Sequence, residues 1–290
     1  MKVAGFTFIR NALKFDYPIV EAIQSILPLC DEFIVAVGQS ADETLSLVKS
    51  INSPKIKIIE TVWDDSLRKG GAVLARETDK AFAAISKDVD WAFYIQADEV
   101  VHEKYHPAIR LAMQKHVADE NVEGLLFNYL HFYGSYDYVA DSYDWYRREV
   151  RIVKRNLPIY SYRDAQGFRK ENNKKLTVKL IDAFVYHYGW VKNPRAMQHK
   201  QEEFNKLWHD DEWVAANVQQ VEAFDYNAIT MLHRFEGAHP KVVQERIAAR
   251  NWNFDYDPAK NEYSVKIKMK KWVEKWTGWR VGEYRNYRTG

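Results

Sequence analysis

Cysteine is almost absent from this sequence, which has Cys30 alone among 290 residues. A single cysteine excludes a disulfide framework and a cysteine-built zinc site, and its apolar surroundings predict a buried structural thiol. No apolar run approaches the length of a membrane-spanning helix, so none is expected. Residues 1–9 predict a strand rather than a signal peptide, which favours a cytoplasmic protein. No glycine-rich stretch has the spacing of a P-loop, and no low-complexity linker divides the chain.

The sequence as a whole has no large excess of positive or negative charge, but its C-terminal segment is strongly basic. The chain has a net charge of +2, whereas residues 264–290 contain eight Lys or Arg and only two acids. The rest of the chain is therefore net acidic, and it has no RNA-binding signature. We expect no nucleic acid partner for such a protein.

Strand and helix patterns alternate in the first half of the chain. Apolar or β-branched runs predict strands, and one-sided apolar spacing predicts helices between them. The expected strands are 3–9, 33–37, 55–61 and 91–96, with helices at 19–27, up to residue 50, and 72–86. This alternation predicts an α/β fold with a mostly parallel central sheet flanked by helices.

The second half of the chain is more varied. Helices are expected at 108–118, 200–216 and 240–251, and strands at 123–133, 147–155 and 175–188. Because residues 147–155 alternate charged and apolar side chains, they predict an exposed strand. We expect one large domain, residues 1–230, followed by a helical, basic C-terminal extension, residues 231–290.

Residues 89–100 carry the most information about function. Their apolar run ends in two adjacent carboxylates, Asp98 and Glu99, where a strand would leave a parallel sheet. Functional sites of open α/β folds lie at the carboxyl ends of strands. Acids placed there can hold a divalent metal against the phosphates of a nucleotide. The alternative is a strand followed by a solvated acidic turn.

Short motifs follow three of the expected strands in a suggestive order. Arg10-Asn11-Ala12 follows the first strand, Ser40-x-Asp42-x-Thr44 follows the second, and Gln96-Ala97-Asp98 ends the fourth. This order resembles the nucleotide-sugar half of family 2 glycosyltransferases, which have the GT-A fold. The resemblance covers residues 1–100 and extends more loosely to about residue 190, within an acceptor half expected at 101–230. Two positions depart from the family, because Gly38 and Gln96 stand where aspartates are usual.

The resemblance implies a metal-dependent, inverting hexosyltransferase. Its donor would be a nucleoside diphosphate sugar, most commonly a UDP-sugar, with Mn²⁺ or Mg²⁺ as cofactor. Its acceptor would be a saccharide or lipid-linked saccharide of a bacterial surface polysaccharide. Candidate nucleotide contacts lie at the strand ends. The metal ligands would come from residues 96–99, called the acidic loop below, and from a later strand. The nucleotide contacts are Thr7, Arg10, Asn11, Asp42, Gln96 and Asp98, and the metal ligands are Asp98 and His187.

Other readings of these residues stay open. His187 and His131 are equally well explained as satisfied structural histidines. Inversion also needs a carboxylate base to deprotonate the acceptor hydroxyl, and Asp164 and Glu149 are the candidates. Glu149 lies between Arg147 and Arg151 at strand spacing, so it could instead belong to a ladder of ion pairs. Because Gln96 departs from the family, an inactive or non-enzymatic carbohydrate- or nucleotide-binding protein is the alternative function.

The C-terminal segment, residues 264–290, combines tryptophans and lysines on one expected helix. Met269, Trp272 and Trp276 form an apolar stripe, with lysines on the other side. Basic amphipathic helices with tryptophan commonly lie on anionic membranes, here the inner face of the cell membrane. The interpretation favoured by the sequence is a helix that docks on the catalytic domain through its tryptophans, and membrane contact is the alternative.

Overall fold

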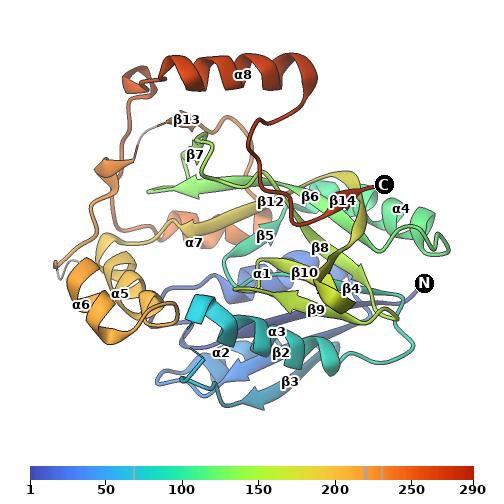
Figure 1. Ribbon diagram of the computed structural model, residues 1–290. Coiled ribbons are helices and arrows are strands. Elements are labelled where there is room, and N and C mark those ends of the chain that lie inside the picture. The colour runs from blue at the N-terminus through green and yellow to red at the C-terminus, as the bar shows by residue number, and fades with distance from the viewer. Residues whose placement is uncertain (68, 219–220, 230) are drawn as a thin grey trace.

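An eleven-stranded sheet forms the centre of the computed structural model, which describes residues 1–67, 69–218, 221–229 and 231–290. Helices cover both faces of the sheet (Figure 1). Side chains of α1, α2 and α4 pack into the core on one face, and side chains of α3 pack on the other. The two buried layers hold the strand ends, and with them the candidate site, in fixed positions.

The first half of the chain contributes the parallel part of the sheet, in the order β3-β2-β1-β4. The strands are β1 (Val3–Ile9), β2 (Glu32–Gly38), β3 (Ile56–Thr61) and β4 (Trp91–Tyr94). The helices between them are α1 (Ile19–Ile26), α2 (Thr44–Lys49) and α3 (Ala72–Ala83). The α/β fold class predicted from the sequence is confirmed here.

Beyond β4 the sheet becomes mixed. Strand β8 runs antiparallel between β4 and β6, β12 is parallel to β6, and β5 is antiparallel to β12. The strands are β5 (Glu99–Val101), β6 (Gly124–Tyr133), β7 (Tyr138–Ala140), β8 (Arg148–Lys154) and β12 (Thr177–Trp190), with α4 (His106–His116) between β5 and β6. A separate small sheet contains β9 (Ile159–Tyr162), β10 (Gly167–Lys170) and β11 (Lys174–Lys175). Neighbouring strands among β1–β4 are thus all parallel, whereas the rest of the sheet combines parallel and antiparallel pairs.

The last third of the chain contains helices and two short strands. They are α5 (Pro194–Asn205), α6 (Asp211–Asn217), β13 (Leu232–Arg234), α7 (Gln244–Ala248), α8 (Val265–Thr277) and β14 (Arg288–Thr289). Strand β13 pairs with β7, and β14 pairs with β12, so the extension also adds to the main sheet. The division at residue 230 stays a prediction. In the described part of the chain, no helix has the length and apolar character needed to cross a bilayer.

Strand β8 corrects one expectation. It was predicted to be exposed, yet Glu149 is 1% exposed and Arg151 is fully buried. The Arg151 charge is tolerated inside because the Glu99 carboxylate compensates it, and burial raises the pKa of Glu149, which favours its neutral form. The stretch between the expected strands 123–133 and 147–155 contains a further strand, β7, and the single helix expected at 200–216 is divided into α5 and α6.

Candidate active site

The acidic doublet lies at the carboxyl end of β4, as the sequence predicts. The Asp98 carbonyl accepts a hydrogen bond from the Tyr188 backbone N–H at 2.8 Å. Glu99 begins β5 and pairs with His187 on β12. The acidic loop is therefore held against β12, a strand that begins about 80 residues later in the sequence.

Glu99 fixes the shape of this loop from inside the protein. Its carboxylate accepts two hydrogen bonds from the Arg151 guanidinium, at 2.7 and 2.8 Å, and one from the Tyr129 hydroxyl at 2.8 Å. The backbone N–H of Gln96 donates to the same carboxylate at 3.1 Å. Since Glu99 and Arg151 are both fully buried, Glu99 is a structural residue and is not a solvated acid.

Asp98 faces two basic groups that come from different elements. Its Oδ1 lies 3.8 Å from Nε2 of His187, and its Oδ2 accepts a hydrogen bond from Nζ of Lys200 at 3.4 Å. Burial alone would raise the pKa of Asp98, but Lys200, His187 and Lys192 together outweigh burial and the pKa is lowered. Burial lowers the pKa of both His187 and Lys200. Asp98 is thus kept ionised beside a neutral imidazole.

His131 determines which nitrogen of His187 carries the hydrogen. Nε2 of His131 lies 2.6 Å from the Tyr146 carbonyl, which can only accept, so this nitrogen is protonated. Burial holds the pKa of His131 well below its usual value, so the ring is neutral and its Nδ1 has no hydrogen. The hydrogen bond of 3.1 Å between the two Nδ1 atoms must therefore be donated by His187. Neutral His187 is left with a bare Nε2, and this atom faces Asp98.

The space beside this pair is kept open by Gly189. A Cβ atom at position 189 would lie 2.7 Å from both Oδ2 of Asp98 and Nε2 of His187. A carboxylate oxygen and a bare imidazole nitrogen that face each other are atoms that could bind a divalent cation. Across the described ranges, no three His, Cys, Asp or Glu side chains gather as a complete metal site. The protein would supply two ligands, and phosphates and water the rest, as is usual for Mg²⁺.

A cavity of about 410 Å³ is lined by Gln96, two residues before Asp98. Its other lining residues are Tyr143, Asp144, Trp145 and Tyr146 from the aromatic loop, residues 141–147, then Asp164 and Gln166, and Arg280, Gly282, Glu283 and Tyr284 from the tail, residues 264–290. Tyr146 lines the cavity and also accepts the hydrogen bond of His131. The cavity therefore combines amide, carboxylate and aromatic groups, which suit the hydroxyls and apolar faces of a sugar.

Of the two candidate bases, only Asp164 lines this cavity. It lies in the turn between β9 and β10, between Arg163 and Ala165, whose φ angles of 56° and 64° are left-handed. Burial raises the pKa of Asp164. Glu149 is enclosed instead, and a Cβ at Gly167 would lie 2.7 Å from its Oε1. Burial raises the pKa of Glu149 to about 7.

The candidate nucleotide contacts at the ends of β1 and β2 already bind other residues of the protein. Asn11 receives a backbone hydrogen bond from Ala41 at 2.8 Å, and Asp42 receives one from Lys14 at 2.8 Å. Arg10 forms an ion pair with Asp65 at 2.9 Å and lies over the Trp63 ring. Thr7 is buried within β1, away from the strand end. The structure thus gathers Arg10, Asn11 and Asp42 at one edge, and Gln96 and Asp98 at the end of β4.

Lys200 and Arg280 are site residues that sequence reasoning missed. Lys200 reaches Asp98 from α5, and Arg280 reaches the cavity from the tail. No local pattern distinguishes Lys200 from other lysines on helices, because its partner lies 102 residues away. Arg280 was counted only as part of the basic tail.

Comparison with known proteins gives structural likeness without a sequence match. No family model matches the chain, and no curated protein matches it. The chain is similar to the crystal structure of S. aureus TarS 1-349, with 15% identity, a TM-score of 0.43, and coverage of 77% of this chain and 67% of that one. In the crystal structure of S. aureus TarS the match covers 41% of that chain, with a TM-score of 0.44.

The chain is also similar to glucosyl-3-phosphoglycerate synthase from Mycobacterium tuberculosis in complex with Mn²⁺, UDP and phosphoglyceric acid. There the identity is 19%, the TM-score is 0.31, and the match covers 45% of this chain and 43% of that one. Both similar proteins are GT-A glycosyltransferases.

Proposed function

We propose that this protein is a glycosyltransferase that moves a hexosyl group from a nucleoside diphosphate sugar to a saccharide acceptor, with inversion. The observation that carries the proposal is the pair formed by Asp98 and His187, which face each other with no hydrogen between them. Gln96, two residues before Asp98, lines a cavity that also contains Asp164, together with the acids Asp144 and Glu283. Metal, base and sugar site would thus meet at the carboxyl end of β4.

Asp98 and His187 would hold Mn²⁺ or Mg²⁺. When bound, the ion would stabilise the negative charge that builds up on the leaving diphosphate. Lys200 keeps the Asp98 carboxylate ionised and holds one of its oxygens, so that the other faces His187. Gln96 donates its amide to the Ala165 carbonyl at 3.1 Å and thereby ties the acidic loop to the turn of Asp164.

Asp164 would act as the base, ahead of Glu149. The acceptor oxygen forms a bond to the anomeric carbon while the bond from that carbon to the phosphate oxygen breaks. The electron pair leaves with the nucleoside diphosphate, and the acceptor proton passes to the Asp164 carboxylate. Its position in the cavity supports this role, whereas Glu149 is enclosed by Gly167.

The donor half of the site would use the ends of β1 and β2. Arg10, Asn11, Asp42 and Gln96 are the proposed nucleotide contacts, with Thr7 supporting them from within β1. We propose a UDP-sugar as donor, and a saccharide or lipid-linked saccharide of a bacterial surface polysaccharide as acceptor. Such a reaction would take place in the cytoplasm, at the inner face of the cell membrane.

Calorimetric titration with UDP, GDP and their sugar conjugates, with and without Mn²⁺, tests this proposal. Wild type should bind one nucleotide only when Mn²⁺ is present, and Asp98→Ala should lose this binding. Asp182→Ala is the matched control, because Asp182 is an exposed aspartate on the strand that carries His187. Failure of wild type to bind any nucleotide under either condition would contradict the proposal.

A binding protein without catalysis is the second candidate, and Gln96 favours it, because an amide stands where the family has an acid. The same preparations distinguish the two functions. Release of nucleotide from the bound sugar donor, measured over time with added acceptor saccharides, is expected of the transferase. Metal-dependent binding without any such release would favour the binding protein.

A further inference from the structure

The apolar stripe of α8 faces away from the protein. Its members, Val265, Met269, Trp272 and Trp276, are 74%, 66%, 65% and 73% exposed. Their spacing of four, three and four residues places them on one side of a helix. In Figure 1, α8 lies at the edge of the molecule, beyond β7 and β13. No residue of α8 is buried, so the rest of the protein does not cover this stripe.

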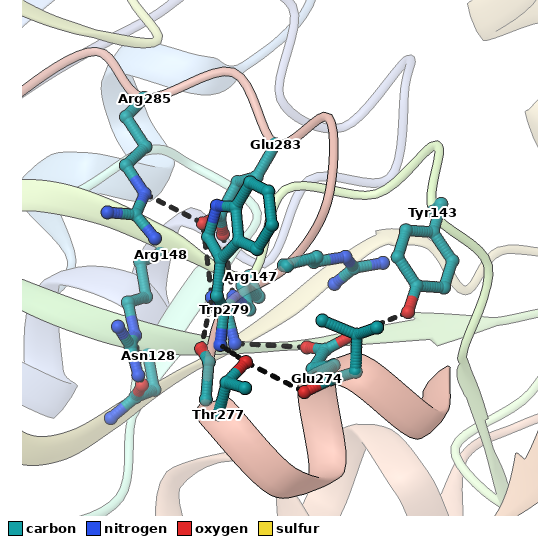
Figure 2. Close-up of polar contacts among 12 residues, drawn as sticks. Asn128, Tyr143, Arg147, Arg148, Glu274, Thr277, Trp279, Glu283 and Arg285 are labelled. Atoms are coloured by element: carbon teal, nitrogen blue, oxygen red, sulfur yellow. Dashed lines mark hydrogen bonds and ion pairs between the residues drawn. The ribbon is translucent and has the colours of Figure 1, made fainter. Parts of the chain in front are cut away.

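Polar contacts on the opposite side hold α8 in this orientation. Glu274 accepts hydrogen bonds from Arg147 at 3.0 Å and from the Tyr143 hydroxyl at 2.7 Å. Figure 2 shows Arg147 between Glu274 and Glu283, and it also binds Glu283, at 2.6 Å. Lys271 forms an ion pair with Asp141. The helix therefore docks through charged groups, and its tryptophans are turned outward.

Charge reinforces this division between the two sides of α8. Glu274 and Glu283 are the only acids in residues 264–290, and Arg147 pairs with both of them on the inner side. Lys266, Lys268 and Lys275 are exposed beside the apolar stripe. The outer surface of α8 therefore presents tryptophan, methionine and lysine without a carboxylate of its own.

We propose that the outer face of α8 binds the surface of an anionic lipid bilayer. Tryptophan and methionine would enter the boundary between headgroups and acyl chains, while the lysine ammonium groups remain at the level of the lipid phosphates. A second copy of the chain is a poorer occupant, because a two-fold interface would bring lysines against lysines. This binding goes beyond the transferase proposal and does not depend on it.

Sedimentation of the full chain with vesicles tests the proposal. Vesicles of phosphatidylcholine with phosphatidylglycerol should bind the protein, and vesicles of phosphatidylcholine alone should bind it at least about tenfold more weakly. The double variant Trp272→Ala, Trp276→Ala should lose about tenfold in affinity for the anionic vesicles. Lys268→Glu with Lys275→Glu should weaken binding similarly, and added salt should reduce wild-type binding.

Trp213→Ala on α6 is the matched control, since Trp213 is 38% exposed and lies outside the tail. It should bind vesicles as wild type does. Unchanged melting temperatures in all variants would show that they fold. Equal binding of wild type to both vesicle types would overturn the proposal. So would light scattering that shows a Trp272-dependent dimer with no vesicle binding. Nucleotide titration of the same variants should match wild type, which separates this test from that of the transferase.

Discussion

The Nδ1 atoms of His131 and His187 lie 3.1 Å apart on the neighbouring parallel strands β6 and β12. Through this hydrogen bond, a residue that does not reach Asp98 sets the tautomer of one that does. His131 is held in turn by the Tyr146 carbonyl. The sequence alone did not decide whether His131 and His187 are structural histidines. Their hydrogen bond indicates a different role for each. His187 presents a lone pair, and His131 orients it.

Replacing His131 should therefore weaken metal binding without touching either proposed ligand. His131→Phe removes the acceptor for the His187 Nδ1 hydrogen, and we expect Mn²⁺ affinity to fall by about 10- to 100-fold. His131→Asn keeps an acceptor oxygen near the position of Nδ1, so its Mn²⁺ affinity should fall much less. Electron paramagnetic resonance of free Mn²⁺ during titration measures the affinities of both variants. Equal affinities of His131→Phe and wild type would contradict the tautomer assignment, provided that the variant is folded.

The two candidate bases should differ in their effect on turnover. Asp164→Asn removes the proposed base from the cavity, and we expect kcat to fall by about 10²- to 10⁴-fold while nucleotide affinity is kept. Glu149→Gln should retain most of the activity, because Glu149 does not line the cavity. Initial rates of nucleotide release with acceptor, together with calorimetric nucleotide binding, test this. A larger loss in Glu149→Gln than in Asp164→Asn would reverse the assignment.

Glu149 should make the stability of the fold depend on pH. Burial raises its pKa from 4.5 to about 7, so the folded protein binds this proton more tightly than the unfolded chain. The resulting stabilisation is full below about pH 4.5 and is lost as the pH rises through about 7. A shift of this size corresponds to about 3 kcal/mol.

Urea unfolding at pH 5 and pH 8 measures this dependence. Glu149→Gln mimics the protonated acid, so it should be more stable than wild type at pH 8 and nearly equal to it at pH 5. Glu120→Gln, at an exposed position, is the control and should follow wild type at both values. A constant difference between Glu149→Gln and wild type across this range would exclude Glu149 as the titrating group.

The buried pair of Glu99 and Arg151 should be essential for stability. Arg151→Met leaves the Glu99 carboxylate buried without its cation, and we expect a loss of about 3 to 5 kcal/mol in the free energy of unfolding. The double variant Arg151→Met, Glu99→Gln removes the charge as well and should recover part of this loss. Denaturant unfolding of the three proteins measures the effect. A loss below about 1 kcal/mol in the single variant would mean that the pair does not hold the acidic loop.

The sequence predicted the parallel part of the sheet and the place of the acidic doublet. Continuous apolar runs mark β1, β2 and β4 because these strands are buried on both faces. The end of β4 could be located because the apolar run stops at Gln96. Patterns of this kind are local, so they can be recognised without knowledge of the tertiary structure.

The missed features depend on distant partners. Strand β8 was expected to be exposed because its charges alternate, yet Glu99 compensates Arg151 from 52 residues away. Lys200 carries no local signal for its contact with Asp98. The amphipathic pattern of α8 predicted a helix, but it could not tell which side would meet the protein. Arg147, a residue of another segment, decides that question by binding Glu274.

Only Gly278 and Trp279 separate the end of α8 from Arg280, the first cavity residue of the tail. A movement of α8 would therefore also move Arg280 in the cavity wall. Arg280 is anchored to the Ser142 carbonyl at 2.7 Å and lies over the Tyr143 ring, so displacement of α8 would also strain the aromatic loop. A contact that supports α8 from outside would therefore influence the width of the cavity. The proposed nucleotide contacts at the ends of β1 and β2 are formed by other segments and would keep their positions.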